Sequence, residues 1–341
     1  MNRVNKYLFA SFLSTFASLF ATLFLIMSIV FFIQIARITS YIEISFSELL
    51  KLYLFMLPQI LLFTIPIGFF VSVAMSFFRL SKENESIVIF TLGQDPKNIS
   101  NFFIFISFIV SVVMLINSLV VMPIAQNLND NFIEYKKTKL SLNIKPSEFG
   151  QKFGNWMVFI EKQNDNNDSL KYENIVMYDV SDKNERLITS QSGDIKNQNS
   201  NLELILKKGK MYDIRDDKWN ISSYENMVIR TLIKDNKNET YSLKEYWLKA
   251  FDDDKRAKDL SIYTLVALFP LASVMFALSF GIVTYRYEKG IIYFGIFGVL
   301  FAYFALIMLF ARQPIYAIPI IFIASFAFSA LTFGKKILKK Y

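Results

Sequence analysis

The chain has 341 residues, of which 53% are hydrophobic and 16% aromatic, and its formal net charge is +8. It contains neither Cys nor His. This composition excludes disulfide frameworks, thiolate nucleophiles, zinc–thiolate sites, Ser-His-Asp triads and imidazole metal ligands. The hydrophobic fraction is above that of ordinary soluble domains and favours a membrane protein.

Six uncharged runs dense in Phe, Leu, Ile and Val predict membrane-spanning helices. A helix needs about 20 residues to cross a hydrocarbon core of ~30 Å, and the shortest run has 22. The first run follows Arg3 and Lys6 but is too long for the apolar core of a secretory signal, so we expect it to be retained. The six runs are residues 7–36, 52–78, 98–129, 260–285, 290–311 and 313–334.

Residues 124–259 form an insert with 23 basic and 23 acidic residues, so its net charge is zero. Short apolar segments at 156–160, 174–180, 202–207 and 224–230 predict strands, and polar clusters such as 163–169 and 197–201 predict turns between them. Residues 243–258 predict a helical connector. The expected fold is therefore an α-helical membrane protein with six transmembrane helices and an inserted extracytoplasmic all-β domain, resembling a sandwich or jellyroll.

The expected organisation is three spans over 1–123, the β domain over 124–259, and three spans with a basic tail over 260–341. An even number of spans places both termini on one side of the membrane. Eleven Lys and Arg residues outside the insert fall on that side and three fall in the short loops opposite. The positive-inside rule therefore predicts cytoplasmic termini and a periplasmic β domain. The net charge therefore reflects the orientation of the chain in the membrane, and we expect no nucleic-acid partner.

Catalytic motifs are absent from the sequence. It has no G-x-x-x-x-G-K-[ST] segment for nucleotide and no titratable pair deep in a span. Asp252, Asp253 and Asp254 allow a hard-cation site or a charged helix cap, and Asn167 stands in an N-x-S pattern that is either a glycosylation acceptor or a polar turn. We expect no catalytic residue, metal site or cofactor in this chain, and no enzymatic activity of its own.

Basic residues at the edges of the spans are candidate binding groups. Arg37, Lys51 and Arg312 fall in or beside the loops predicted on the extracytoplasmic side. Long basic side chains commonly anchor helices at an interface, and guanidinium groups also suit phosphate. Both interpretations of these three residues, an anchor or an anion contact, remain open from position alone.

The segment after the second span predicts a short amphipathic cytoplasmic helix over about 80–93. Arg79 precedes it, Ser81 is the expected N-cap, Glu83 and Glu85 fall in the expected first turn, and Gly93 is the expected stop. Such a helix is either an ordinary interfacial helix or a docking helix whose carboxylates meet a cytoplasmic partner.

Several segments together resemble the LptF/LptG (YjgP/YjgQ) permease family. In residues 78–93, Glu85-Ser86-Ile87 leads to Gly93, eight residues after Glu85, as in that family's coupling segment. Residues 142–149, 156–160, 172–179 and 204–211 resemble the opening of its β-jellyroll, and the span–insert–span order is the same. One position departs from the pattern, since Tyr263 stands where the family often has Arg. The run at 254–260 leans towards LptF.

This resemblance implies a permease subunit of an ATP-driven lipopolysaccharide exporter. The implied partners are an LptB-like ATPase dimer, a paralogous LptF- or LptG-like permease, an LptC-like anchored β protein and an LptA-like periplasmic bridge. It assigns Glu85 to ATPase coupling, with Glu83, Arg79 and Gly93 beside it. Arg37, Arg312 and Lys51 become candidates for holding lipid phosphates. The rival interpretation is a membrane-anchored receptor or assembly protein with a ligand-binding β domain, and a secondary carrier is a third.

Overall fold

The computed structural model describes residues 3–39, 44–142, 151–153, 156–166, 169–179, 185–198, 201–215, 218–232, 243–282 and 289–339. Its contacts divide the chain into two compact units. The helical unit comprises Met1–Ile38, Ser45–Asn129 and Tyr241–Tyr341, and the sheet unit comprises Thr39–Ile44 and Asp130–Thr240. The sheet unit is shorter at both ends than the insert expected over 124–259. The predicted glycosylation acceptor Asn167 lies outside the described residues. Arg286 and Lys340, two of the eleven basic residues counted on the side of the termini, also lie outside them.

Within the described residues, six helices are long and apolar enough to cross a membrane, which confirms the predicted number of spans. The third span is one continuous helix in which a π-helical turn, η1, joins α4 to α5. The second, at 52–78, is longer than predicted by six residues at its start, and the fourth begins at Asp254 instead of 260. The helices are α1 (Arg3–Thr39), α2 (Phe46–Lys82), α4 (Pro96–Ile116), η1 (Asn117–Val121), α5 (Met122–Leu142), α7 (Asp254–Gly281), α8 (Lys289–Phe310) and α9 (Pro314–Phe333) with η3 (Gly334–Leu338).

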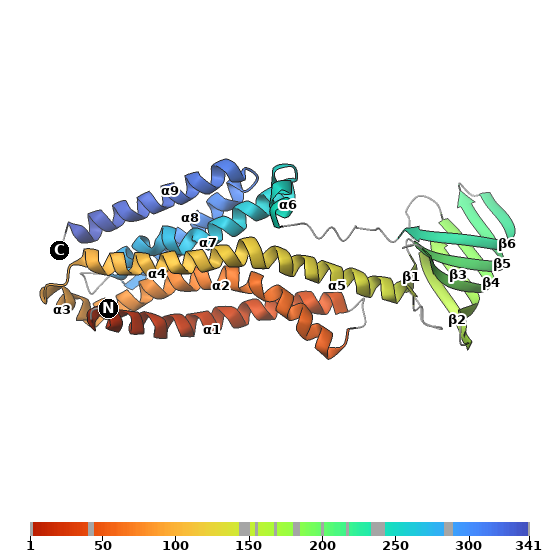
Figure 1. Ribbon diagram of the computed structural model, residues 1–341, viewed down its shortest axis with the longest axis horizontal. Helices are drawn as coiled ribbons and strands as arrows, with labels where there is room; N and C mark the ends of the chain where they lie inside the picture. Colours follow the sequence, from red (N-terminus) through yellow and green to blue (C-terminus); the bar gives the residue numbers. More distant parts are fainter. Residues whose placement is uncertain are drawn as a thin grey trace. The chain divides into compact units, whose positions relative to one another are not determined.

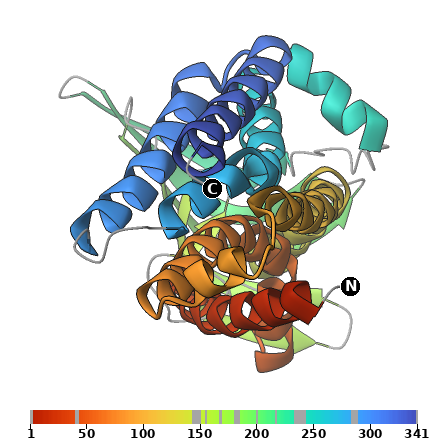
Figure 2. The same ribbon diagram turned by 90° about the vertical axis from the view of Figure 1, so that its left-hand side faces the viewer.

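Helix α7 lies at the centre of the helical unit. α2, α4, α8 and α9 all contact it, and the end-on view of Figure 2 shows the helices gathered around it. α2 and α7 are mostly buried, whereas α1, α8 and α9 expose most of their apolar surface. α1 meets the bundle through phenylalanine rings, with Phe12 at 5.3 Å from Phe69 and 5.9 Å from Phe103 between ring centroids. The exposed apolar surface is what a lipid-facing helix requires, because hydrocarbon is its solvent.

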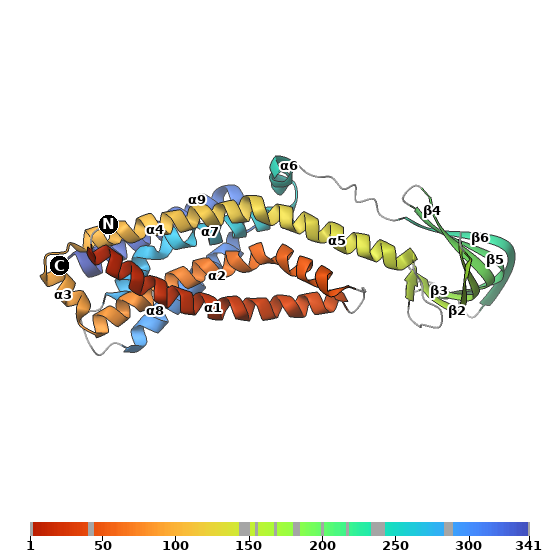
Figure 3. The ribbon, with the colours of Figure 1, turned by 60° about the horizontal axis from the view of Figure 1, so that its bottom comes forward.

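Two short helices lie at opposite ends of the helical unit. α3 (Glu85–Thr91) lies at the same end as both chain termini, and α6 (Leu243–Leu248), followed by the 3₁₀ turn η2 (Lys249–Phe251), lies at the other end (Figures 1 and 3). The predicted connector over 243–258 therefore comprises α6, η2 and the start of α7, which begins at Asp254. Asp253 caps α7 by accepting a hydrogen bond of 3.0 Å from the Lys255 backbone N–H. Among the described residues no group of three potential ligands forms a metal site.

The sheet unit contains one antiparallel sheet whose six strands follow in chain order, β1 to β6. The predicted all-β domain is confirmed, and its topology is a meander, without the Greek keys of a regular jellyroll. β1 and β4 were not among the predicted strands. Polar clusters were expected to form turns at 163–169 and 197–201. Their described residues belong to strands, whereas 167–168 and 199–200 lie outside the described residues. The strands are β1 (Gln151–Phe153), β2 (Trp156–Asn166), β3 (Ser169–Asp179), β4 (Glu185–Gln198), β5 (Asn201–Arg215) and β6 (Lys218–Leu232).

The antiparallel register is interrupted along one row of residues that crosses the sheet, which we call the crease. Between β3 and β4, Glu173 pairs with Ser192 and Ile175 with Ser190, but the intervening pair is missing, and the same gap recurs between the other long strands. Within the described sheet the positions missing from the strand register are Glu161, Asn174, Gln191, Lys208 and Glu225, and the Asn174 amide donates a 2.7 Å hydrogen bond to Glu161 Oε2. Asn174 and Lys208 have left-handed φ angles of 53° and 51°.

The crease keeps apolar side chains on one face of the sheet. On β3 the buried side chains are Tyr172, then Ile175 and Met177, so the period of two is interrupted once, at the crease. Such irregularities bend strands and redirect side chains, and Figure 3 shows β5 and β6 strongly curved. At the same place Tyr224 donates a 2.9 Å hydrogen bond to the Thr189 carbonyl, and burial raises the pKa of its hydroxyl. The result is a bent sheet with one continuous apolar face.

Candidate coupling site and basic rim

Helix α3 begins later than the sequence predicted. α2 continues to Lys82, so Ser81 lies inside α2, and the prediction that it caps the next helix is wrong. The N-cap of α3 is Asn84, whose φ of 62° makes the sharp turn between the helices. Glu83 is the C-cap residue of α2 and not part of the first turn of α3. Glu85 does lie in that first turn, as predicted.

Gly93 ends the α3 segment as predicted. It follows the C-cap residue and has a φ of 83°, a conformation that favours glycine because it has no Cβ. Asp95 then caps α4 by accepting a 2.8 Å hydrogen bond from the Lys97 N–H. A pocket of about 440 Å³ lies along this turn and reaches Leu338 of η3.

Glu85 is fixed by the first span. The Tyr7 hydroxyl of α1 donates a hydrogen bond of 2.5 Å to Glu85 Oε2. Nearby on α2, Arg79 Nη2 donates to Ser11 Oγ at 2.8 Å, and Ser11 Oγ lies 2.9 Å from Ser76 Oγ in a further hydrogen bond. The structure thus brings two of the predicted coupling residues, Glu85 and Arg79, into side-chain contact with the same helix, α1.

A second set of hydrogen bonds joins α3 to α7. Ser86 Oγ donates to Ser81 Oγ at 3.1 Å, and Ser81 Oγ donates to the Gly281 carbonyl at 3.0 Å. The backbones of α2 and α7 approach closely there, because a Cβ on Gly281 would lie 2.5 Å from the Cβ of Phe77. The seven residues of α3 are therefore tied to the first span and, through Ser81, to the central span.

The outward face of α3 is partly apolar. Ile87, Val88 and Leu92 are exposed to 37%, 53% and 81% of their surface, and Glu83 is also exposed. Apolar side chains beside a carboxylate at the end of a membrane bundle are suited to contact a protein partner that supplies its own basic groups.

The three rim residues come from three separate elements. Arg37 lies in the last turn of α1, Lys51 lies in the N-terminal part of α2, and Arg312 lies in the turn between α8 and α9. All three side chains are exposed, at the end of the helical unit opposite α3. They form a dispersed basic rim and not a closed anion pocket.

A cluster of polar and aromatic side chains connects α6 to the spans at this second end. The Tyr246 hydroxyl donates to Gln126 Oε1 at 2.8 Å, and Gln126 Nε2 donates to the Tyr263 hydroxyl at 3.0 Å. The indole of Trp247 donates to the Leu119 carbonyl at 2.9 Å, and the Arg256 guanidinium lies 4.2 Å from the centroid of the Tyr246 ring. Sequence reasoning missed this cluster and also Tyr7, since isolated Tyr and Gln residues give no recognisable spacing.

Comparison with known protein families identifies the family of this chain. The profile of the lipopolysaccharide export system permeases LptF/LptG matches residues 6–334, nearly the whole chain. The chain belongs to the LptF/LptG family. The search of curated proteins found no match to this chain. An LptF/LptG permease is a lipopolysaccharide-export subunit of an ABC transporter that works with other Lpt components, and it is not itself an enzyme. The six spans and inserted sheet accord with a multi-pass inner-membrane protein of this family.

Proposed function

We propose that this chain is the transmembrane permease subunit of an ATP-driven exporter that extracts lipopolysaccharide from the inner membrane, and that α3 docks a separate ATPase. The observation that carries the proposal is the position of α3 between two connections. One runs from Glu85 to Tyr7 on α1, and the other from Ser86 through Ser81 to Gly281 on α7. A displacement of α3 by an ATPase would reach both spans directly.

The charge distribution supports the orientation that this proposal requires. With eleven basic residues on the side of the termini and three opposite, the end that carries α3 faces the cytoplasm, where ATP is available. The sheet unit then belongs to the periplasm. ATP hydrolysis is assigned to an LptB-like dimer, and no nucleotide-binding motif occurs in the sequence.

The basic rim is proposed to contact lipid phosphates. Arg37 and Arg312 carry guanidinium groups that suit phosphate oxygens, and Lys51 adds a third cation on the same side. Arg37→Glu should lower photo-crosslinking to lipopolysaccharide several-fold while assembly is unchanged. An unchanged crosslinking yield would favour the role of Arg37 as an interfacial anchor.

The sheet unit is proposed to receive the acyl chains. Its apolar face is continuous across the crease and includes Ile175, Met177, Leu204 and Leu206, which are buried in the single bent sheet. The further partners would be an LptC-like anchored β protein, which shares this role, and an LptA-like bridge, which continues it. The paralogous permease would be LptG-like if this chain is LptF, as the run at 254–260 favours.

Co-purification tests the proposal against its rival. A tagged chain, solubilised from native membranes, should bring down an ATPase subunit and a second permease of similar size in fixed stoichiometry. A membrane receptor with a periplasmic ligand would bring down neither. Recovery of the chain without an ATPase, under conditions in which a known exporter complex stays intact, would overturn the proposal.

A further inference from the structure

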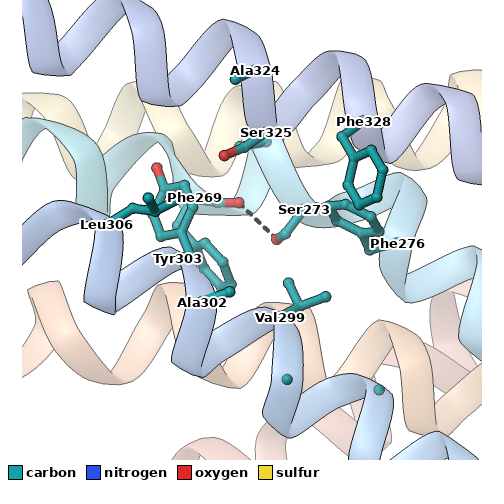
Figure 4. Close-up of a pocket in the computed structure, with 13 residues that line it drawn as sticks. Phe269, Ser273, Phe276, Val299, Ala302, Tyr303, Leu306, Ala324, Ser325 and Phe328 are labelled. Carbon is teal, nitrogen blue, oxygen red and sulfur yellow. Dashed lines mark hydrogen bonds between the residues drawn. The ribbon is translucent and has the colours of Figure 1, made fainter.

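An apolar cavity of about 490 Å³ lies between α7, α8 and α9 in the membrane-spanning part of the chain and is partly open to the surface (Figure 4). α8 and α9 both contact α7, which forms the floor of the cavity. Small residues line its middle from all three helices, including Ser273, Gly298, Ala302, Ala324 and Ser325. We call this cavity the slot.

Aromatic rings close both ends of the slot. Phe269 and Tyr303 lie at one end with ring centroids 4.8 Å apart, and Phe276 and Phe328 lie at the other with centroids 5.6 Å apart (Figure 4). The Tyr303 hydroxyl donates to the Leu265 carbonyl at 2.8 Å, which fixes the ring in place. Along α7, the seven residues from one end to the other correspond to about 10 Å at ~1.5 Å per residue.

The slot offers water almost nothing to bind. The Ser273 hydroxyl donates to the Phe269 carbonyl at 2.7 Å, within its own helix, and the Tyr303 hydroxyl is also occupied. No charged side chain lines the slot. An ordered water needs about two to four polar partners, so a site of this kind does not hold water.

From this geometry we infer that the slot holds one acyl chain of a membrane lipid. It lies near the middle of the three spans, where the surrounding solvent is hydrocarbon, and an empty slot would forfeit the dispersion contacts of its walls. Its length of about 10 Å is roughly two thirds of one leaflet of a ~30 Å hydrocarbon core.

The inference does not depend on lipopolysaccharide being the exported substrate. A phospholipid and lipopolysaccharide both offer acyl chains, and the slot recognises the chain only. The bound acyl chain fills the space between α8 and α9 on α7 and so keeps the two helices at a fixed separation.

Photo-crosslinking tests the inference on the unaltered chain. The complex is reconstituted in bilayers that contain phosphatidylethanolamine with a diazirine in the middle of one acyl chain, and the labelled peptides are mapped. Labelling should concentrate on the slot residues Ser273 and Ser325, above the bilayer-exposed rings of Phe297 and Phe301 on α8. Labelling of the exposed rings without the slot residues would overturn the inference.

Native mass spectrometry with a matched pair of variants identifies the lipid. Ala324 and Ala327 are both exposed on α9, one turn apart, but only Ala324 lines the slot. Ala324→Phe should lose a lipid adduct that Ala327→Phe and the wild type retain, and the adduct mass distinguishes phospholipid from lipopolysaccharide. Identical adducts in all three proteins would contradict an acyl chain in the slot.

Discussion

The two ends of the helical unit each tie a short helix to the spans, but with different chemistry. At one end α3 is held by a charged carboxylate, Glu85, which accepts from Tyr7, an exposed residue. At the other end the contacts of α6 are partly buried, with Gln126 bonded to both Tyr246 and Tyr263 and the Arg256 guanidinium over the Tyr246 ring. A hydrogen bond exposed to water is weaker and easier to exchange than one shielded from it.

We propose from this difference that α3 is the helix that moves and that α6 stays in place. α3 can exchange its exposed contact for one to a partner, which is what a coupling element requires. The Tyr246 side chain of α6 is buried and its hydrogen bond to Gln126 is partly buried, and α6 lies just before the fourth span, so it suits an anchor where the chain enters the membrane. The following predictions test this contrast, from the largest expected effect to the smallest.

Gln126→Leu should be the most damaging change at the α6 end. It leaves the hydroxyls of Tyr246 and Tyr263 without their shared partner, which costs about 2–3 kcal/mol of folding stability. The measurement is thermal unfolding of the purified protein in lipid nanodiscs. Gln34→Leu, the same change at an exposed position on α1, serves as control and should leave the unfolding temperature unchanged. Equal effects of the two variants would show that Gln126 does not anchor α6.

Gly281→Ala should perturb the α3 end by backbone crowding. The added methyl would lie 2.5 Å from Phe77 Cβ and 2.8 Å from the Ala74 carbonyl oxygen. Relief of this overlap should cost about 1–2 kcal/mol and shift the Ser81 contact. The same measurement applies, with Gly334→Ala as control, since nothing lies within 4 Å of a Cβ there. Equal stability of both variants would show that the helices separate freely at Gly281.

Tyr7→Phe should have the smallest effect on folding and a specific effect on coupling. It removes one exposed hydrogen bond, worth about 0.5–1 kcal/mol, so stimulation of the ATPase should fall roughly twofold to fivefold. The loss of folding stability should not exceed about 1 kcal/mol, measured against the control Tyr316→Phe at an exposed position on α9. Normal stimulation in Tyr7→Phe would show that Glu85 acts without its link to α1.

Much of the helical unit was predictable because the bilayer imposes a simple rule. Every span must be long and apolar, so hydropathy alone located all six spans. The short helix predicted over about 80–93 contains α3. The helix ends were less predictable. Ser81 looked like a cap by residue type, yet its hydroxyl donates to Gly281, 200 residues away, and only tertiary structure reveals such a contact.

The sheet was harder to predict because its pattern is interrupted. On β5, Leu204 and Leu206 are buried, but Lys208 has a left-handed φ and the apolar side resumes later, at Met211. A search for alternation of period two therefore ends a strand where the structure continues it. β4 is rich in Ser and other polar residues, and its pairing on both sides, not its composition, makes it a strand.

The most direct test of the account is the behaviour of Glu85→Lys in the assembled complex, compared with Glu85→Gln. Reversing the charge should abolish lipopolysaccharide export and the stimulation of ATP hydrolysis, while the permease still co-purifies with its ATPase. Glu85→Gln still accepts a hydrogen bond from Tyr7 and should retain part of both activities. Normal export by Glu85→Lys would contradict the central claim that α3 couples the ATPase to the spans through this carboxylate.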